Sequence, residues 1–378
     1  MTLKIDWEKT PNQTGIDETA ITSMFKHAFG DKDLASYQVI SDSCANLNFK
    51  LMVQNQENPL ILRIYIRDKD SVYKEQKLAK LIKQKIPVPQ TYFIGEFAGY
   101  NFALTEYMQG TTMRNLLLNM PDENSDEVVY EAGKMLSLIS SFQFKSSGFF
   151  DNRLLSKLAS GREFEGDLGS ARTESSTQMY MRIPSTESTD KLPAEVELRK
   201  KSNEFNVLPS TDSSLEFALK TLQHQRAKEY LGLKQINLIA DILNKYGAFF
   251  PDETHRCLVH GDYDPANILV DKIEGKWKIT AILDWEFAFS GSWLCDISKM
   301  LRYAHKIPAS FEDSFLKGVT DSGLILPDNW KITTYLLNIL FLLDCLVRSE
   351  PNERPNQCAD IKELISYFTN KLSESIVI

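Results

Sequence analysis

Two carboxylates and one amide lie at the ends of apolar runs in the second half of the chain: Asp262, Asn267 and Asp284. Short apolar runs of this kind predict buried β-strands, which would hold the polar groups rigidly in a dry site. Oxygen ligands such as Asn267 and Asp284 suit Mg²⁺, which usually takes water and phosphate oxygens as its other ligands. Asp262 is not needed as a ligand, so its carboxylate could accept the proton of a hydroxyl nucleophile. The residue types therefore predict phosphoryl transfer assisted by a metal ion.

Asp, Asn, Gly and Pro are also the usual turn residues, so each of these side chains alone would predict only a tight turn. Their order and spacing favour chemistry: Asp262 is followed five positions later by Asn267, and a later strand-like run ends at Asp284. Protein kinases use a catalytic Asp, a metal-binding Asn and a metal-binding Asp in this order. We therefore interpret Asp262 as the catalytic residue and Asn267 and Asp284 as metal ligands.

At these residues the chain resembles the aminoglycoside phosphotransferase family, the small-molecule relatives of protein kinases. The family's His-Gly-Asp motif stands here at residues 260–262, with the expected Asn at 267, and its Ile-Asp-Trp-Glu-like stretch stands as Leu-Asp-Trp-Glu at 283–286. The protein-kinase forms His-Arg-Asp and Asp-Phe-Gly do not occur. The motif is specific for the superfamily, but it does not identify the acceptor.

The resemblance covers most of the chain and implies an α+β, two-lobed, protein-kinase-like fold. A small antiparallel-sheet lobe, residues 1–107, would bind the nucleotide, and a mostly helical large lobe, residues 108–378, would carry catalysis and the acceptor, with the active site between the lobes. Sequence periodicity agrees with this division. Before residue 108, helical spacing at 16–30 and 71–85 alternates with strand-like runs at 37–40, 47–53, 60–66, 92–95 and 101–107. After it, the patterns are mainly helical: 128–142, 215–222, 227–250, 311–322, 330–348 and 359–372.

The turn at residues 41–46 would cover the nucleotide phosphates by this resemblance, but its sequence, Ser-Asp-Ser-Cys-Ala-Asn, contains no glycine. The family often has a Gly or Ser and an Asn here, which implies that Ser43, Asn46 and backbone N–H groups hold phosphate. By its turn chemistry alone, the same stretch would equally be an ordinary hairpin turn.

Arg63 occupies the place of the family's phosphate-binding lysine, in a strand-like run. Glu75 lies three residues before Leu78, on the inward face of the next helix. An inward carboxylate needs a cationic partner, because an unpaired buried charge is costly. We therefore expect an Arg63–Glu75 ion pair; the alternative is an arginine that faces solvent.

The stretch Leu-Thr-Glu-Tyr-Met-Gln-Gly at residues 104–110 resembles the family's hinge. The resemblance implies that the Thr105 carbonyl and the Tyr107 N–H hold the adenine edge; the alternative is a plain linker between lobes. Residues 160–200 are rich in Ser, Thr, Glu and Gly. Long stretches without periodicity are lids, binding loops or disordered segments, so this insert is either a specificity element or a flexible surface loop.

Three neighbours of the motifs also have expected roles. In this family the His of the motif is more often structural than catalytic, and we assign His260 that role. An Asp near position 296 braces the catalytic loop in the family, and Asp296 fits. Glu286, two residues after Asp284, either reaches a second metal or the acceptor, or is a surface charge.

The composition of the chain argues against some classes of partner and indicates the cellular compartment. The chain has 378 residues and a net charge of −8, which argues against a nucleic-acid partner. Its five cysteines are scattered without a Cys-x-x-Cys pair, which is typical of reduced thiols in a cytoplasmic protein. The most apolar helix candidate, residues 335–347, contains Asn338 and Asp344 and is too short to span a bilayer, so we expect no membrane partner.

These observations predict a phosphotransferase that moves the γ-phosphate of ATP, with GTP as an alternative, to a hydroxyl of a small molecule, using Mg²⁺ and Asp262 as the base. The main alternative is a pseudokinase that binds nucleotide without transfer, which the glycine-free turn and Arg63 favour. A protein kinase is disfavoured because the His-Arg-Asp and Asp-Phe-Gly motifs are missing. A further alternative is a nonenzymatic interaction protein that binds its partner through residues 160–200. Protein partners and the acceptor are not predicted.

Overall fold

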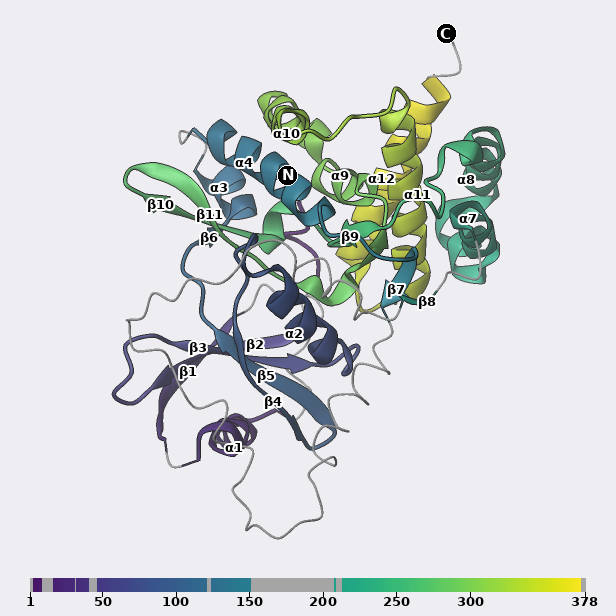
Figure 1. The fold of residues 1–378 in the computed structure, drawn as a ribbon. Coiled ribbons are helices and arrows are strands. Elements are labelled where there is room, and N and C mark those ends of the chain that lie inside the picture. Colours follow the sequence, from purple (N-terminus) through teal and green to yellow (C-terminus); the bar gives the residue numbers. More distant parts are fainter. Residues whose placement is uncertain are drawn as a thin grey trace. The chain divides into compact units, whose positions relative to one another are not determined.

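The computed structural model describes residues 3–8, 16–30, 32–40, 46–120, 124–150, 207–208 and 213–374. Contacts between Cα atoms divide the chain into two units (Figure 1). The sheet unit has its described residues within Lys9–Met108, and the helical unit has them within Met1–Glu8, Gln109–Phe150 and Val207–Ile378. Residues 3–8 therefore belong to the helical unit, whereas we expected them in the N-terminal lobe, residues 1–107. Ser43 and the insert at 160–200 lie outside the described residues.

The sheet unit contains five antiparallel strands in the order β1-β2-β3-β5-β4, together with two helices. Its elements are α1 (Glu18–Phe29), β1 (Leu34–Ile40), β2 (Leu47–Val53), β3 (Leu60–Tyr65), α2 (Ser71–Ile82), β4 (Thr91–Phe97) and β5 (Tyr100–Glu106).

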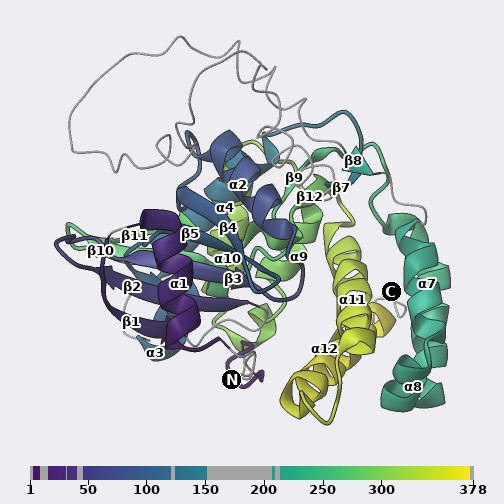
Figure 2. The same ribbon diagram turned by 90° about the horizontal axis from the view of Figure 1, so that it is seen from below.

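Period-two alternation decides which face of each strand is buried, as the pattern over residues 47–53 predicted. Alternate residues of β2 and β3 point into one core, and helix α1 covers it with apolar residues at helical spacing (Figure 2). Helix α2 packs on the other face, where Val72 contacts Tyr65 and Ala103. The sheet therefore has one helix packed on each face.

The helical unit contains helices and two small sheets, with strand orders β11-β10-β6 and β8-β7-β12-β9. Its helices are α3 (Met113–Asn119), α4 (Asp126–Ser140), α7 (Ser214–Gln223), α8 (Gln225–Tyr246), α9 (Leu294–Met300), α10 (Ser310–Asp321), α11 (Trp330–Arg348) and α12 (Pro355–Glu374). Its strands are β6 (Thr111–Thr112), β7 (Gly148–Phe150), β8 (Val207–Leu208), β9 (Cys257–Val259), β10 (Ile268–Ile273), β11 (Lys276–Ile282) and β12 (Phe289–Gly291).

The main core of the helical unit lies among α7, α8, α11 and α12 (Figure 2). Leu3 packs into this core and is 4% exposed, which explains why residues 3–8 belong to this unit. The α+β fold with an antiparallel-sheet unit and a mostly helical unit is as predicted.

Helix α11, Trp330–Arg348, has the bounds that the helical pattern over residues 330–348 predicted, and it extends beyond the apolar stretch 335–347 that we judged too short for a membrane span. Its 19 residues are long and apolar enough for a membrane span by length and composition alone, so the expectation that it is too short is wrong. More than half of that window is buried inside the protein, and Asn338 within it bonds to Arg302 Nε and to the Ser298 carbonyl. These are the contacts of a core helix, in which the polar residue has buried partners.

Candidate active site

The turn that presents Asp262 is held by one glycine and one aspartate. Gly261 has a φ of +81°, and a Cβ at this position would lie 2.4 Å from the Phe287 carbonyl oxygen, so only glycine fits. Asp296, fully buried on α9, accepts hydrogen bonds from the His260 and Gly261 N–H groups at 2.8 and 2.9 Å. Burial raises the pKa of Asp296 to about 7, against the lowering effect of these two donors. Asp296 thus braces the loop, as the resemblance implied.

His260 fixes the same turn through both ring nitrogens. Its Nε2 donates to the Leu283 carbonyl at 2.9 Å, and its Nδ1 accepts from the Asp262 N–H at 3.2 Å. Burial lowers the pKa of this histidine, so the ring is neutral, with one donor and one acceptor nitrogen. His260 ties the end of β11 to the turn, which agrees with the structural role expected for it.

Asp262 and Asn267 lie in direct contact. The Asn267 amide nitrogen donates to the Asp262 side-chain Oδ2 at 3.0 Å and to its main-chain carbonyl at 2.9 Å. Both bonds orient the same NH₂ group, so the amide oxygen of Asn267 points away from Asp262. An oriented amide oxygen is the donor atom that a hard cation takes.

Asp284 follows β11 and is brought beside Asn267 by the backbone, because the Leu283 N–H donates to the Asn267 carbonyl at 2.8 Å. Asp284 adopts the left-handed conformation, with a φ of 66°. Such a non-glycine residue is uncommon and is found most often at functional sites. One carboxylate and one amide oxygen fit Mg²⁺, which keeps waters and takes phosphate oxygens. In the part of the chain that the structure describes, no group of three His, Cys, Asp or Glu residues is arranged to hold a metal.

Lys4 is a residue of this site that the sequence analysis did not identify. Its Nζ lies 2.9 Å from Asp264 Oδ2 and 3.3 Å from Asp262 Oδ1. Burial alone would raise the pKa of Asp262, but Lys4, Lys299 and Arg302 together hold it well below its usual range. Burial alone would lower the pKa of Lys4, but the two carboxylates outweigh it and raise the pKa above its usual value. Asp262 is therefore ionised.

Asp264 and Glu286 also have defined places. Asp264 caps the short helical turn Pro265–Asn267 by accepting from the Ala266 N–H at 2.9 Å, and it is 4% exposed. Glu286 is 6% exposed, so the alternative that it is a surface charge is wrong. Its acidic side chain lies inside the helical unit, two positions after Asp284.

In the sheet unit, the predicted Arg63–Glu75 ion pair is present, with Arg63 Nη2 and Glu75 Oε1 at 3.2 Å. Tyr65, two residues along the same strand, donates its hydroxyl to the other carboxylate oxygen of Glu75 at 2.6 Å. Both oxygens of Glu75 are therefore bonded from β3, which fixes the Arg63 side chain in place. Its role in phosphate binding stays a prediction.

The other described residues that we predicted to bind the nucleotide lie at or next to the ends of strands in the same sheet. Asn46 is 1% exposed, and its side-chain oxygen accepts from the Ile66 N–H at 3.1 Å, which links β2 to the end of β3. Thr105 pairs with Ile61 and Thr91 near the end of β5. Tyr107 follows β5, with the Lys50 ammonium 4.1 Å from its ring centre. The roles of Ser43, Asn46, Thr105 and Tyr107 toward a nucleotide stay predictions.

The chain belongs to the phosphotransferase enzyme family, because the sequence pattern of that family matches residues 36–330. No curated protein sequence matches the chain. This membership confirms the family resemblance and the prediction of a phosphotransferase. The acceptor does not follow from it.

Solved structures with low sequence identity share the fold over nearly the whole chain. A thermostable mutant of aminoglycoside phosphotransferase APH(4)-Ia, in a ternary complex with AMP-PNP and hygromycin B, has a TM-score of 0.60 at 14% identity, covering 93% of this chain and 98% of that one. The microcompartment-associated aminopropanol kinase has a TM-score of 0.56 at 11% identity, covering 96% and 98%. Choline kinase LicA from Streptococcus pneumoniae has a TM-score of 0.53 at 11% identity, covering 93% and 99%. These likenesses confirm the kinase-like fold.

Proposed function

We propose that the protein transfers the γ-phosphate of ATP to a hydroxyl group of a small molecule, with Asp262 as the base. The observation that carries this proposal is the contact between Asp262 and Asn267. One amide group holds the carboxylate of Asp262 and at the same time turns its own oxygen away from it. That oxygen would then be available as a ligand for a cation.

The site residues of the helical unit have distinct roles in this proposal. Asp262 is ionised, and 22% of its side chain is exposed, so an acceptor hydroxyl can reach it. Asp262 then orients the hydroxyl and takes its proton. Asn267 and Asp284 would hold Mg²⁺, which neutralises charge on the phosphates when bound. His260 and Asp296 keep the turn rigid, so that catalysis comes from positioning and electrostatics.

The sheet unit would bind the nucleotide. Arg63, fixed by Glu75 and Tyr65, offers a guanidinium that remains charged and suits a phosphate. Thr105 and Tyr107 would hold the adenine edge through their backbone groups, as the family resemblance implies. ATP is the expected nucleotide, with GTP as an alternative, and the cytoplasm is the expected compartment.

The acceptor is proposed only as a class. The three structures compared above are an aminoglycoside phosphotransferase in complex with hygromycin B, an aminopropanol kinase and a choline kinase. All three names point to small hydroxyl compounds that carry an amine or ammonium group. We therefore test such compounds first and include sugars without an amine as a contrast.

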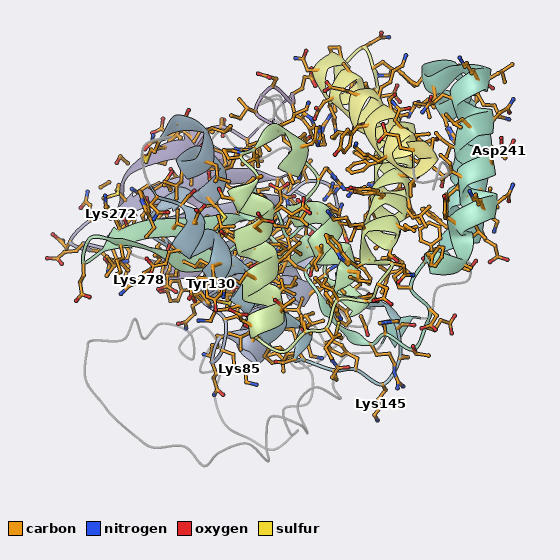
Figure 3. All side chains as sticks on the ribbon, turned by 90° about the horizontal axis from the view of Figure 1, so that it is seen from above. Lys85, Tyr130, Lys145, Asp241, Lys272 and Lys278 are labelled. Atoms are coloured by element: carbon orange, nitrogen blue, oxygen red, sulfur yellow. The ribbon has the colours of Figure 1, made fainter. Side chains whose placement is uncertain are left out.

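The experiment is a nucleotide-consumption assay with Mg²⁺ and a panel of aminoglycosides, choline, amino alcohols and sugars. Asp262→Ala should abolish the turnover that depends on the acceptor while nucleotide binding is retained. Asp241→Ala, at an exposed position of α8, is the matched control and should leave turnover unchanged (Figure 3). Normal turnover by Asp262→Ala would refute the role of Asp262.

A pseudokinase is the second candidate function. It is favoured by the contacts that already occupy both carboxylate oxygens of Asp262, Lys4 on Oδ1 and Asn267 on Oδ2. A nucleotide-binding protein without transfer would bind Mg²⁺ and ATP but consume no nucleotide with any acceptor of the panel. The same assay, combined with a binding measurement, therefore separates the two functions.

A further inference from the structure

Residues 3–8, here called the N-terminal segment, are fastened to the helical unit at several points. Leu3 is buried in its core, and the Trp7 indole N–H donates to Asp360 Oδ2 at 2.8 Å. Glu8 accepts from the Asn356 and Gln357 N–H groups at 2.8 and 3.1 Å, which are orphan donors in the first turn of α12. The segment is thus anchored on both sides of Lys4.

The backbone at Lys4 is held in an unfavourable conformation. Leu3 and Lys4 have φ values of 35° and 64°, a region that residues with a Cβ seldom occupy. Residues in such a conformation are strained, and they persist only where the surroundings fix them. The contacts of Leu3, Trp7 and Glu8 hold the backbone in this conformation, and the backbone in turn places the ammonium group of Lys4.

That ammonium group lies between two like charges. Lys4 Nζ bridges Asp262 and Asp264, whose side chains are close enough to contact the same nitrogen atom. Without a cation there, the two carboxylates would repel each other. Two other charged groups also act on Asp262, namely Lys299 on α9 and Arg302 two residues after the end of that helix. Among the described residues, Lys4 is the cation recorded within ion-pair distance of both carboxylates.

We propose that Lys4 is a positioning residue of the phosphotransferase: it pulls on Asp262 Oδ1 while Asn267 holds Oδ2, and so sets the orientation in which Asp262 meets the acceptor. The inference rests on the proposed function of Asp262. An autoinhibitory segment is the opposite possibility, because a lysine that merely blocked Asp262 would raise turnover when it is removed. The multiple anchors favour the permanent role, since a blocking segment has to be released.

The test uses the full chain with Lys4→Met, which keeps length and removes charge, and Lys4→Arg, which restores charge. We measure kcat and KM for ATP with an acceptor found in the panel. Lys4→Met should lower kcat about 10- to 100-fold, the size of effect seen when a catalytic group is slightly misplaced. KM for ATP should change little, and Lys4→Arg should recover part of kcat. Lys278→Met, at a half-exposed lysine of β11, is the matched control and should behave as the wild type (Figure 3).

Thermal unfolding of each variant separates a loss of fold from a loss of positioning. Recovery of kcat by Lys4→Arg at a melting temperature equal to that of Lys4→Met supports positioning. Unchanged or raised kcat in Lys4→Met overturns it. If Asp262→Ala retains turnover, the proposed function falls first; if Asp262→Ala is inactive and Lys4→Met is normal, only the role of Lys4 falls.

A second measurement does not depend on turnover. Lysine acylation followed by mass spectrometry compares Lys4, whose side chain is 12% exposed, with Lys278, whose side chain is 49% exposed. Lys4 should react more slowly in the wild type and faster in Asp264→Ala, which removes its shorter ion pair. Equal rates at Lys4 and Lys278 in the wild type would show that the segment does not rest on the loop, and would overturn the inference.

Discussion

At the scale of single residues, the charge around Asp262 comes from side chains that are far apart in the chain. Lys4 comes from the N-terminal segment, whereas Lys299 lies on α9 and Arg302 directly after it. Arg302 is 4% exposed and bonds to Asn338. Where several cations lie close together in a partly buried region, each one makes it harder to keep the others protonated, which lowers their pKa values. The largest such effect is at Lys299.

Lys299 should make stability depend on pH in a defined direction. Burial, followed by the charge of Arg302, lowers the pKa of Lys299 from 10.5 to about 7. Between these values the unfolded chain binds more protons than the folded one, so the free energy of unfolding rises with pH. Lys299→Met lacks this group, so its stability relative to the wild type should be highest below pH 7 and should decline as the pH rises.

The measurement is urea unfolding of wild type and Lys299→Met at about pH 6.5 and about pH 9.5. Groups that do not interact with Lys299 titrate alike in both proteins and cancel in the difference. Asp296 does interact with it: without Lys299 its pKa, about 7 in the wild type, rises further, which also makes the relative stability of the variant decline as the pH rises. The exposed control Lys278→Met should give the same difference from wild type at both pH values. A difference for Lys299→Met that does not change with pH would contradict a lowered pKa.

The candidate site residues of the helical unit could be grouped from the sequence because they lie close together in the chain, and Asn267 does contact Asp262, while their catalytic and metal-binding roles stay predictions. The order of Asp262, Asn267 and Asp284 is itself the signal. Glu75 was also found, since an inward carboxylate on a helix demands a cation, and the pair with Arg63 is present. Lys4 could not be predicted in this way, because 258 positions separate it from Asp262 and the segment around it has no periodic pattern.

At the scale of elements, the helix pair α4 and α10 depends on two glycines that face each other. A Cβ on Gly133 would lie 2.1 Å from the Phe315 carbonyl oxygen, and a Cβ on Gly318 would lie 2.0 Å from the Tyr130 carbonyl oxygen. These neighbours are backbone atoms and cannot rotate away. The two helices therefore approach as closely as backbones allow, and α4 carries Ala132, whose carbonyl accepts from the Tyr263 hydroxyl in the catalytic loop at 2.9 Å.

Gly133→Ala should force α4 and α10 apart. Overpacking of this kind typically costs about 1–3 kcal/mol, and the backbone contact puts this site at the upper end of that range. Lys134→Ala, the next residue on the same helix, is the control: its side chain is 43% exposed, so its loss should change stability by about 0.5 kcal/mol or less. Urea unfolding of the two variants gives the comparison. Equal stability of Gly133→Ala and wild type would mean that the helices do not meet at this glycine.

The longer elements could be predicted from the sequence, and so could the three-residue β9, an apolar run before His260, whereas the other shortest strands could not. The apolar stripe of residues 128–142 indicated α4, and Val129, Leu136 and Ile139 are buried as expected. Strands β6, β7, β8 and β12 have two or three residues each, too few for any period to be visible. Helix α8 was predicted as one continuous element, but Gly232 breaks its helical conformation with a φ of 74°.

At the scale of the whole molecule, the chain forms two units, each with an apolar core of its own. Periodicity alone could not have assigned residues 3–8 to the helical unit, because that assignment depends on contacts with distant α11 and α12. The family resemblance supplied the division into an antiparallel-sheet part and a mostly helical part, which the local patterns alone could not. A ligand that binds only the folded protein raises its free energy of unfolding.

Mg²⁺ with a non-hydrolysable ATP analogue should raise the melting temperature of the wild type. A ligand at one hundred times its Kd stabilises the native state by about 2.7 kcal/mol. Asp284→Asn keeps the size of the side chain but removes the charge that a cation needs, so the additional stabilisation by Mg²⁺ should be lost. In the presence of EDTA, the analogue should stabilise Asp284→Asn as much as the wild type, because the predicted nucleotide-binding residues are unchanged.

Asp241→Asn is the control at an exposed site of α8 and should keep the full effect of Mg²⁺. If Asp284→Asn keeps it as well, Asp284 is not a metal ligand. If neither condition stabilises the wild type, Arg63 and the glycine-free turn do not form a nucleotide site, and the proposed transfer from ATP is wrong.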